Sequence, residues 1–318
     1  MTRRSKAWRG AALAKDEVTY RFPPAAQEAI VAFLSRSERP LLGTLEVDLT
    51  PVAAIRPEIE ELRRRVEQVH GFAIVDPPAT IEAPTKRRDL AWLIGRILGE
   101  PIEQNREGIK VIQVYDRDRT RRMEDGARYH QTRQGGSIHT DNVNRPQTWD
   151  YLMMTCVSPA MLGGESIVVS GLTVYDLLRE RVPRVLDVLA EDFWWECRGF
   201  SDDFFSAPIL FFNQVGEPQF RYLREYLESA HRRQGAPLRD EQLWGLDSLD
   251  SVLELSALQF RCRLAPGEII VIDDLQMFHG RTSFSDFFDA VPYEAGVVGS
   301  DRPLRRCFDR LWISKRGN

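Results

Sequence analysis

The residues of this chain best suited to chemistry include a histidine and an aspartate two positions apart, His139 and Asp141 in the segment GGSIHTDN. Side chains alternate between the faces of an extended strand, so these two project to one side and Thr140 projects to the other. A neutral imidazole and a carboxylate on one face are natural ligands for a divalent metal ion. The same pair also forms an ordinary hydrogen bond, so this motif alone leaves a metal site and a structural contact open.

A second histidine favours the metal site. His279 follows GEIIVIDDLQM, an apolar run typical of a buried strand, and it precedes a glycine. Two histidines and one carboxylate on one side of a metal ion leave its other positions open, which is the facial arrangement of non-haem Fe(II) oxygenases. The sequence therefore predicts that His139, Asp141 and His279 bind one metal ion.

Two further segments carry side chains that suit a dicarboxylate. Ser166 ends the run GGES after the first ligands, and Arg306 and Arg310 lie four residues apart in RCFDR near the C-terminus. The planar fork of an arginine binds a carboxylate through two hydrogen bonds, and a serine hydroxyl can add another. These residues indicate a carboxylate-bearing molecule beside the metal.

The motifs GGSIHTD, GGES, PGEIIVIDDLQMFHGRTSF and RRCFDRLWI, in this order, resemble the taurine dioxygenase (TauD/TfdA-like) family of Fe(II)/2-oxoglutarate-dependent oxygenases. This family includes clavaminate-synthase-like enzymes, and the resemblance spans roughly residues 70–314. It implies that His139, Asp141 and His279 hold Fe(II), and that 2-oxoglutarate and O2 are cosubstrates.

The resemblance also implies roles around 2-oxoglutarate. Arg306 would pair with its distal carboxylate, Ser166 stands where the family usually has a threonine for the same group, and Arg310 would face substrate or cosubstrate. The interval from His279 to Arg306 is longer than is usual in the family, and we attribute the excess to an insertion. Arg305 stays a less favoured alternative, because only Arg306 keeps the four-residue spacing to Arg310.

The reaction implied by the resemblance is hydroxylation of an unactivated C–H bond, coupled to decarboxylation of 2-oxoglutarate to succinate and CO2. Because the carboxylate ligand Asp141 is present, we expect hydroxylation and not halogenation. Desaturation and cyclisation stay open, since they begin with the same hydrogen abstraction. A zinc-dependent hydrolase could use the same three ligands but would not need Arg306 and Ser166. A binding protein on the same fold is a further alternative.

The expected substrate is a polar small molecule, such as an amino acid or an intermediate of secondary metabolism. Two polar segments, 115–136 and 283–303, flank the motifs and are predicted to be lid insertions, although solvated loops would have the same composition. The weaker substrate-binding candidates are His130, Arg133, Asn142, Arg221 and Phe287.

The elements that must position these residues are mostly short strands. Apolar spacing predicts helices over 26–36, 54–69 and 88–98, and another over 173–190 that Pro183 divides. Strands are expected elsewhere, from about residue 109 onward, so the fold is mainly β with flanking helices. The resemblance narrows it to a double-stranded β-helix, a cupin-like jelly roll. No linker divides the chain, which predicts one domain over 1–318 with N-terminal helical cover.

The composition is that of an ordinary globular protein. The 318 residues are 43% hydrophobic and 28% charged, with a net charge of −4. A slightly acidic chain lacks the positive charge that nucleic-acid binding requires, so we expect no nucleic-acid partner. No apolar run is long enough to span a membrane and no leader is evident, which predicts a cytoplasmic protein. A homo-oligomer stays open.

Overall fold

The computed structural model describes residues 6–36, 40–43, 50–117, 120, 131–133, 137–286 and 305–315. Its helices are α1 (Pro24–Arg36), α2 (Arg56–Arg65), α3 (Pro84–Leu98), α4 (Gly171–Arg181), α5 (Arg184–Leu189), α6 (Arg224–Arg233) and α7 (Asp240–Leu253). Its strands are β1 (Thr19–Arg21), β2 (Phe72–Asp76), β3 (Glu100–Ile102), β4 (Ile112–Val114), β5 (Tyr151–Ser158), β6 (Leu162–Gly163), β7 (Ser166–Ser170), β8 (Asp192–Glu196), β9 (Phe204–Pro208), β10 (Leu210–Phe212), β11 (Pro218–Phe220), β12 (Gln259–Cys262), β13 (Ile269–Asp273), β14 (Met277–Arg281), β15 (Phe284–Ser285) and β16 (Cys307–Ser314).

Two sheets carry the fold. In the described part of the chain, the larger sheet has seven strands in the order β1-β2-β13-β5-β16-β3, and β4 also pairs with β16. The smaller sheet has the order β12-β7-β14, and its pairs are antiparallel. An isolated antiparallel bridge between His139 and His279 adds the segment around His139 beside β14. The smaller sheet is therefore the one that brings two of the predicted ligands together.

Strand β13 shows why the apolar run before His279 is continuous. Ile269 and Val271 pack into a cluster with the N-terminal helices, whereas Ile270 and Ile272 pack into the cluster between the two sheets. A strand that is buried on both faces needs apolar residues at every position, not at alternate ones. The run thus builds the centre of the fold, and its polar end continues into the segment that bears His279.

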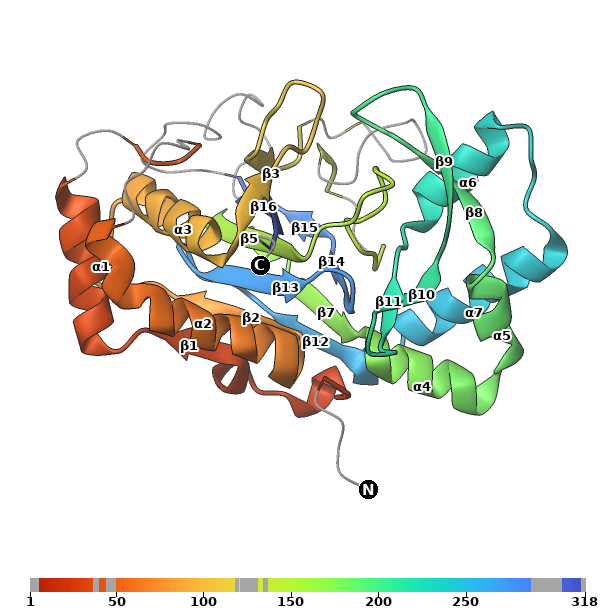
Figure 1. Ribbon diagram of the computed structural model, residues 1–318, viewed down its shortest axis with the longest axis horizontal. Coiled ribbons are helices and arrows are strands. Elements are labelled where there is room, and N and C mark those ends of the chain that lie inside the picture. Colours follow the sequence, from red (N-terminus) through yellow and green to blue (C-terminus); the bar gives the residue numbers. More distant parts are fainter. Residues whose placement is uncertain are drawn as a thin grey trace.

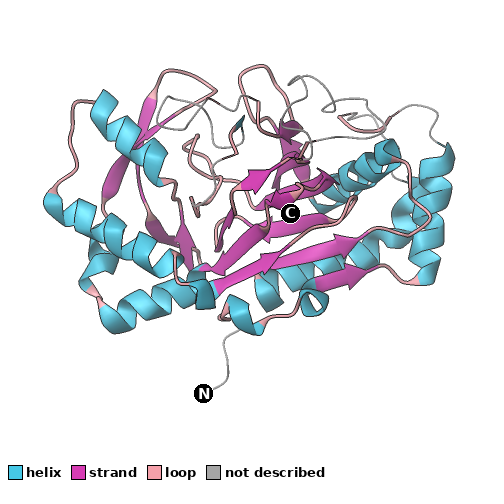
Figure 2. Ribbon diagram, turned by 180° about the vertical axis from the view of Figure 1, so that it is seen from behind, coloured by secondary structure: helices cyan, strands magenta, loops and turns pink. Residues whose placement is uncertain are grey.

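The two sheets face each other across one core, and helices cover both outer faces (Figures 1 and 2). The cluster between the sheets joins side chains such as Phe72 and Leu152 of the larger sheet to Val168 and Phe260 of the smaller one. Helices α1, α2 and α3 lie on the outer face of the larger sheet, and α4 to α7 lie beside the smaller one. This arrangement confirms the predicted jelly roll with flanking helices.

The predicted elements match the structure closely at the N-terminus. Helix α1 coincides with 26–36, and α2, with short helical turns on either side, coincides with 54–69. Pro183 separates α4 from α5 as predicted. Helices α6 and α7 are an addition to the four helical ranges that apolar spacing predicted. No helix in the described part of the chain combines the length and apolar character that crossing a bilayer requires.

The two predicted lid insertions lie largely outside the described residues, which exclude 118–119, 121–130, 134–136 and 287–304. The two substrate candidates His130 and Phe287 fall in these ranges and so lie outside the described residues as well. The lids therefore stay predictions.

Candidate metal centre and cosubstrate cavity

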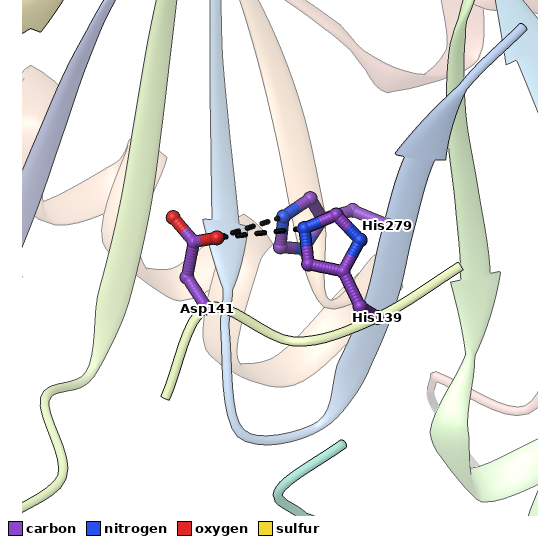
Figure 3. Close-up of side chains that lie close together, drawn as sticks. All are labelled: His139, Asp141 and His279. Carbon is purple, nitrogen blue, oxygen red and sulfur yellow. Dashed lines mark ion pairs between the residues drawn. The ribbon is translucent and has the colours of Figure 1, made fainter. Parts of the chain in front are cut away.

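The three predicted metal ligands converge on one point, although His279 lies far from the others in the sequence (Figure 3). The backbones of His139 and His279 exchange two hydrogen bonds, with N···O distances of 2.8 and 2.7 Å. Their Nε2 atoms lie 3.5 and 3.6 Å from Oδ1 of Asp141. One potential donor atom from each residue lies within 4.8 Å of the others.

The far side of each imidazole is oriented by an oxygen. Nδ1 of His139 lies 3.1 Å from the Ser137 carbonyl, and Nδ1 of His279 lies 3.5 Å from Oδ1 of Asp274. The hydrogen bond to Ser137 favours a proton on Nδ1 of His139 and turns its Nε2 lone pair toward a metal ion, whereas Nδ1 of His279 makes no hydrogen bond within the described residues. Burial, together with the neighbouring His139, lowers the pKa of His279 to about 4. His279 is therefore neutral, as a ligand must be.

The carboxylate of Asp141 uses its two oxygens differently. Oδ1 faces the imidazoles, whereas Oδ2 accepts a hydrogen bond from Nε1 of Trp312 at 2.7 Å and lies 3.0 Å from Nη1 of Arg310. Burial acts to raise the pKa of Asp141, but the Arg310 guanidinium and the two imidazoles outweigh it and hold that pKa well below its usual range. Asp141 is therefore ionised and has one oxygen directed at the site.

A buried network holds the ligand segment from behind. Asp274 accepts hydrogen bonds from the Asp141 backbone N–H at 3.0 Å and from Nδ2 of Asn142 at 2.8 Å. Oδ1 of Asn142 accepts a hydrogen bond from the Trp149 backbone N–H, and the Trp149 ring stacks on Trp312 at 4.0 Å between centroids. Because Trp312 donates a hydrogen bond to Asp141, the network holds Asp141 in place through both its backbone and its side chain.

The donor set fits a divalent transition metal. Metal-bound nitrogen and oxygen atoms lie about 2.0–2.2 Å from the ion, so ligands of one ion are about 3 Å apart. The separations of 3.5 and 3.6 Å between each Nε2 and Oδ1 of Asp141 are close to this spacing. Two imidazoles and one carboxylate on one side are the ligand set of non-haem Fe(II) oxygenases.

A cavity extends from these residues to the predicted 2-oxoglutarate residues. Its walls include His139, Asp141, His279, Ser166, Arg306 and Arg310. The same cavity is lined by Arg281, which sequence analysis missed and which pairs with Ser166 in the register of β14 and β7. Arg305 is also buried but does not line the cavity.

Arg306 lies against the glycine motif. Its Nε donates to the Gly164 carbonyl at 3.3 Å, and its guanidinium lies 4.1 Å from the centre of the Phe308 ring. A Cβ on Gly164 would lie 2.9 Å from Cδ and Nε of Arg306, and this residue has φ +68°. Only glycine meets both conditions without strain. The GGES motif therefore makes room for the arginine that faces the cavity.

Several residues near the metal site were missed by sequence analysis. Side chains alternate along a strand, so Arg310 and Trp312 lie on one face of β16. This alternation is the sequence feature from which their shared contact with Asp141 could have been predicted. Asp274 ends the apolar run, but nothing in its spacing indicated a contact with His279. Gln104, whose Oε1 accepts from Nε of Arg310 at 2.8 Å, had no sequence signal.

The described substrate candidates lie at three different places. Arg133 forms an ion pair with Asp116 at 2.6 Å and does not line the cavity. The amide of Asn142 is used by the buried network, and Asn142 does not line the cavity. Arg221 is 4% exposed and donates to the Pro146 carbonyl at 2.9 Å.

Comparison with known proteins gives a family and two curated relatives. The model of the family described as Taurine catabolism dioxygenase TauD, TfdA family matches residues 35–307. The chain is 25% identical to the FR-33289 synthase of Streptomyces rubellomurinus, over 78% of this chain and 71% of that protein. It is 23% identical to a taurine hydroxylase-like protein of Stachybotrys chartarum, over 80% of this chain and 66% of that protein.

Solved structures with the same fold are also found. An asparagine oxygenase, solved with Fe(II), 2S,3S-3-hydroxyasparagine and succinate, superposes with a TM-score of 0.67 at 16% identity over 93% of both chains. The non-haem iron oxygenase OrfP, solved with Fe and alpha-ketoglutaric acid, gives a TM-score of 0.62 at 15% identity over 94% of both chains. At these identities the likeness concerns the fold. The family match, which spans most of the sequence and both sheets, shows that this chain belongs to the TauD/TfdA family of Fe(II)/2-oxoglutarate-dependent oxygenases.

Proposed function

We propose that this enzyme hydroxylates an unactivated C–H bond of a polar small molecule, with His139, Asp141 and His279 as the Fe(II) ligands. The observation that carries the proposal is the convergence of two Nε2 atoms on one oxygen of a buried, ionised carboxylate. When bound, Fe(II) supplies the activation of O2 coupled to decarboxylation of 2-oxoglutarate. Every other task falls to the protein.

The protein's first task is to hold 2-oxoglutarate. We assign its distal carboxylate to Arg306 and Ser166, because both line the cavity that begins at the metal ligands. The guanidinium fork binds a carboxylate through two hydrogen bonds and fixes its direction. Arg310 lines the same cavity, and its contact with Asp141 keeps the ligand charged.

The second task is to place one C–H bond of the substrate beside the metal and to keep water out. Apolar residues such as Val114, Met154 and Ile270 form the remaining cavity walls and favour exclusion of water. The similar structures include an asparagine oxygenase and OrfP solved with L-Arg. This supports an amino acid or a related polar metabolite as the substrate class.

The experiment is to load the purified protein with Fe(II) and 2-oxoglutarate without oxygen and to record the visible metal-to-ligand absorption band. Admission of air should then convert 2-oxoglutarate to succinate. His139→Ala should abolish both signals while the circular dichroism spectrum is retained. Retained turnover in this variant would overturn the ligand assignment.

Arg306 and Arg305 provide a matched pair of variants. Arg306→Ala should raise the apparent KM for 2-oxoglutarate by about tenfold or more, as expected for loss of a charge-assisted hydrogen bond. Arg305→Ala should leave that KM close to the wild-type value. An equal increase in both variants would show that the wrong arginine was chosen.

Desaturation and cyclisation begin with the same hydrogen abstraction and stay alternative outcomes, which product analysis by mass spectrometry distinguishes. In a zinc hydrolase the same three side chains would bind zinc, but the enzyme would not consume 2-oxoglutarate. The single-domain organisation, the cytoplasmic location and any homo-oligomeric state stay predictions from the sequence.

A further inference from the structure

Arg221 is a buried cation that has no anionic partner among the described residues. Its side chain is 4% exposed, and its one hydrogen bond in the described part of the chain runs from Nη2 to the Pro146 carbonyl. Nε and Nη1 are buried and have no hydrogen-bond partner there. The guanidinium lies 4.9 Å from the centre of the Phe205 ring. Burial lowers the pKa of Arg221 to about 10.

A buried guanidinium without an anionic partner lowers the stability of the folded protein. A buried charge normally has an ionised partner and satisfied hydrogen bonds, because desolvation otherwise opposes folding. Arg88 illustrates the usual solution, since it pairs with the buried Asp309 through two hydrogen bonds. Within the described residues Arg221 is incompletely hydrogen-bonded, so Nε and Nη1 are available to a further partner.

Alternation along the chain indicates the face to which Arg221 projects, although Arg221 does not line the cavity at the metal ligands. Phe220 and Tyr222 both contact Phe278, and these three residues belong to the apolar cluster with helices α4 to α7. Side chains alternate along extended chain, so Arg221, between them, projects to the opposite face. That face carries the imidazole of His279, the residue after Phe278.

Backbone pairing places the two histidines between Ser166 and the segment around Arg221. Ser166 lies on β7, His279 lies on the adjacent β14, and His139 is bridged to His279. The next segment is the one around Arg221, because the Thr140 backbone N–H donates to the Tyr222 carbonyl at 2.8 Å. Ser166 and Arg221 therefore lie on opposite sides of the two histidines.

We propose that Arg221 binds an anionic group of the primary substrate, a carboxylate, sulfonate or phosphonate, on the side of the metal opposite the 2-oxoglutarate residues. This assignment rests on the proposed function, which supplies the metal and the cosubstrate. An anion there would accept from Nε and Nη1, complete the hydrogen bonding of the guanidinium and orient the substrate between two fixed points. The substrate class is thereby narrowed to anionic small molecules.

The test uses the protein loaded with Fe(II) and 2-oxoglutarate without oxygen, and measures its melting temperature with acetate, methanesulfonate or methylphosphonate. Acetamide and equimolar sodium chloride are the uncharged and ionic-strength controls. At least one of the three anions should stabilise the wild type beyond both controls, and the anion that does so identifies the group. In Arg221→Met its apparent affinity should fall by about tenfold or more.

Two variants separate binding from structure. Arg221→Gln retains a donor for the Pro146 carbonyl without the charge, so it should lose the anion response even if the methionine variant folds poorly. Arg145 is adjacent to Pro146 in the sequence, and its guanidinium lies over the Phe200 ring. Arg145→Met removes this cation and should keep the stabilisation by the anion. Without any anion, Arg221→Met should melt no lower than the wild type, because it removes an unpaired buried charge.

The proposal is overturned if Arg221→Gln responds to the anions as the wild type does, or if no anion stabilises the wild type beyond the controls. The absorption band of the loaded protein is read in the same samples. If the band is present in the wild type and in the variants, the proposed function is supported independently of the role of Arg221. If the band is absent in the wild type, the proposed function itself is contradicted.

Discussion

Arg310 and Arg221 are both largely buried, yet their surroundings differ. Arg310 lies 3.0 Å from Oδ2 of Asp141, donates to Gln104 and stacks over the Trp312 ring. Arg221 has a single carbonyl and the face of Phe205 as its partners in the described part of the chain. The first arginine is neutralised by the protein, and the second carries a charge that no described residue neutralises.

This contrast teaches how one fold uses the same side chain in two ways. A guanidinium paired with a metal ligand tunes the charge of the ligand and costs little desolvation, since its counter-ion is already present. A guanidinium without a counter-ion is available to an anion that arrives from solvent. Variants that exchange or remove these partners therefore distinguish the two uses.

The largest effect is expected from Asp141→Asn, which removes the metal ligand charge and leaves Arg310 without its carboxylate. Fe(II) affinity should fall by more than about 100-fold, exceeding the effect of changing an outer partner of a ligand. Anaerobic titration with Fe(II) measures this loss. Asp116→Asn, which removes the carboxylate partner of Arg133 outside the cavity, is the control and should bind Fe(II) normally.

Arg310→Met should make metal binding sensitive to acid. In the wild type Arg310 helps to hold the pKa of Asp141 well below its usual range, so the carboxylate stays ionised as the pH falls. Without the guanidinium that pKa rises, protons compete with Fe(II) at a higher pH, and the acid limb of the binding curve moves upward.

For Arg310→Met we expect a loss of up to about 100-fold in Fe(II) affinity near pH 5, shrinking toward neutral pH. Titrations at several pH values measure it. Arg310→Lys retains a positive charge and should keep most of the wild-type profile. An unchanged acid limb in the methionine variant would contradict the role given to this ion pair.

Trp312→Phe should have a smaller effect. The variant loses the hydrogen bond to Oδ2 of Asp141 but keeps an aromatic ring against Trp149. Fe(II) affinity should fall by about tenfold, as is typical for the outer partner of a metal ligand. If the affinity is unchanged while the melting temperature drops, the indole has only a packing role.

The smallest effect is expected for an arginine on the outer surface. Arg184, with a side chain 75% exposed, pairs with Glu241 on α7. Arg184→Ala should lower the free energy of unfolding by no more than about 1 kcal/mol, because exposed ion pairs contribute little. Urea denaturation measures this, and Fe(II) affinity should be unchanged.

Much of the fold follows from local patterns. The run GEIIVIDD predicts a fully buried strand because both faces of β13 are covered, and Pro183 predicts the break between α4 and α5 because proline interrupts a helix. Helices α6 and α7 lie outside the helical ranges that were predicted. The segment around α6 is highly charged and low in apolar content, although its few core residues, such as Leu227, lie on one face of the helix.

The site was only partly accessible from sequence. The H-x-D spacing fixes the common face of His139 and Asp141, but pairing with β14 depends on the register of distant strands, which no local pattern encodes. The contact between Asp141 and Arg310 depends on how the two sheets face each other. The lack of an anion beside Arg221 among the described residues could not be read from the sequence, because no local pattern records a contact that is missing.

The reciprocal peptide hydrogen bonds between His139 and His279 have a consequence for metal exchange. They set the spacing of the two imidazoles by the distance between neighbouring strands, whether or not an ion is held. The distance between the two imidazole ligands is thus set by the backbone, and a metal ion that binds must fit that distance. Ions of unsuitable radius would be discriminated against by the sheet itself, before any difference in ligand chemistry comes into play.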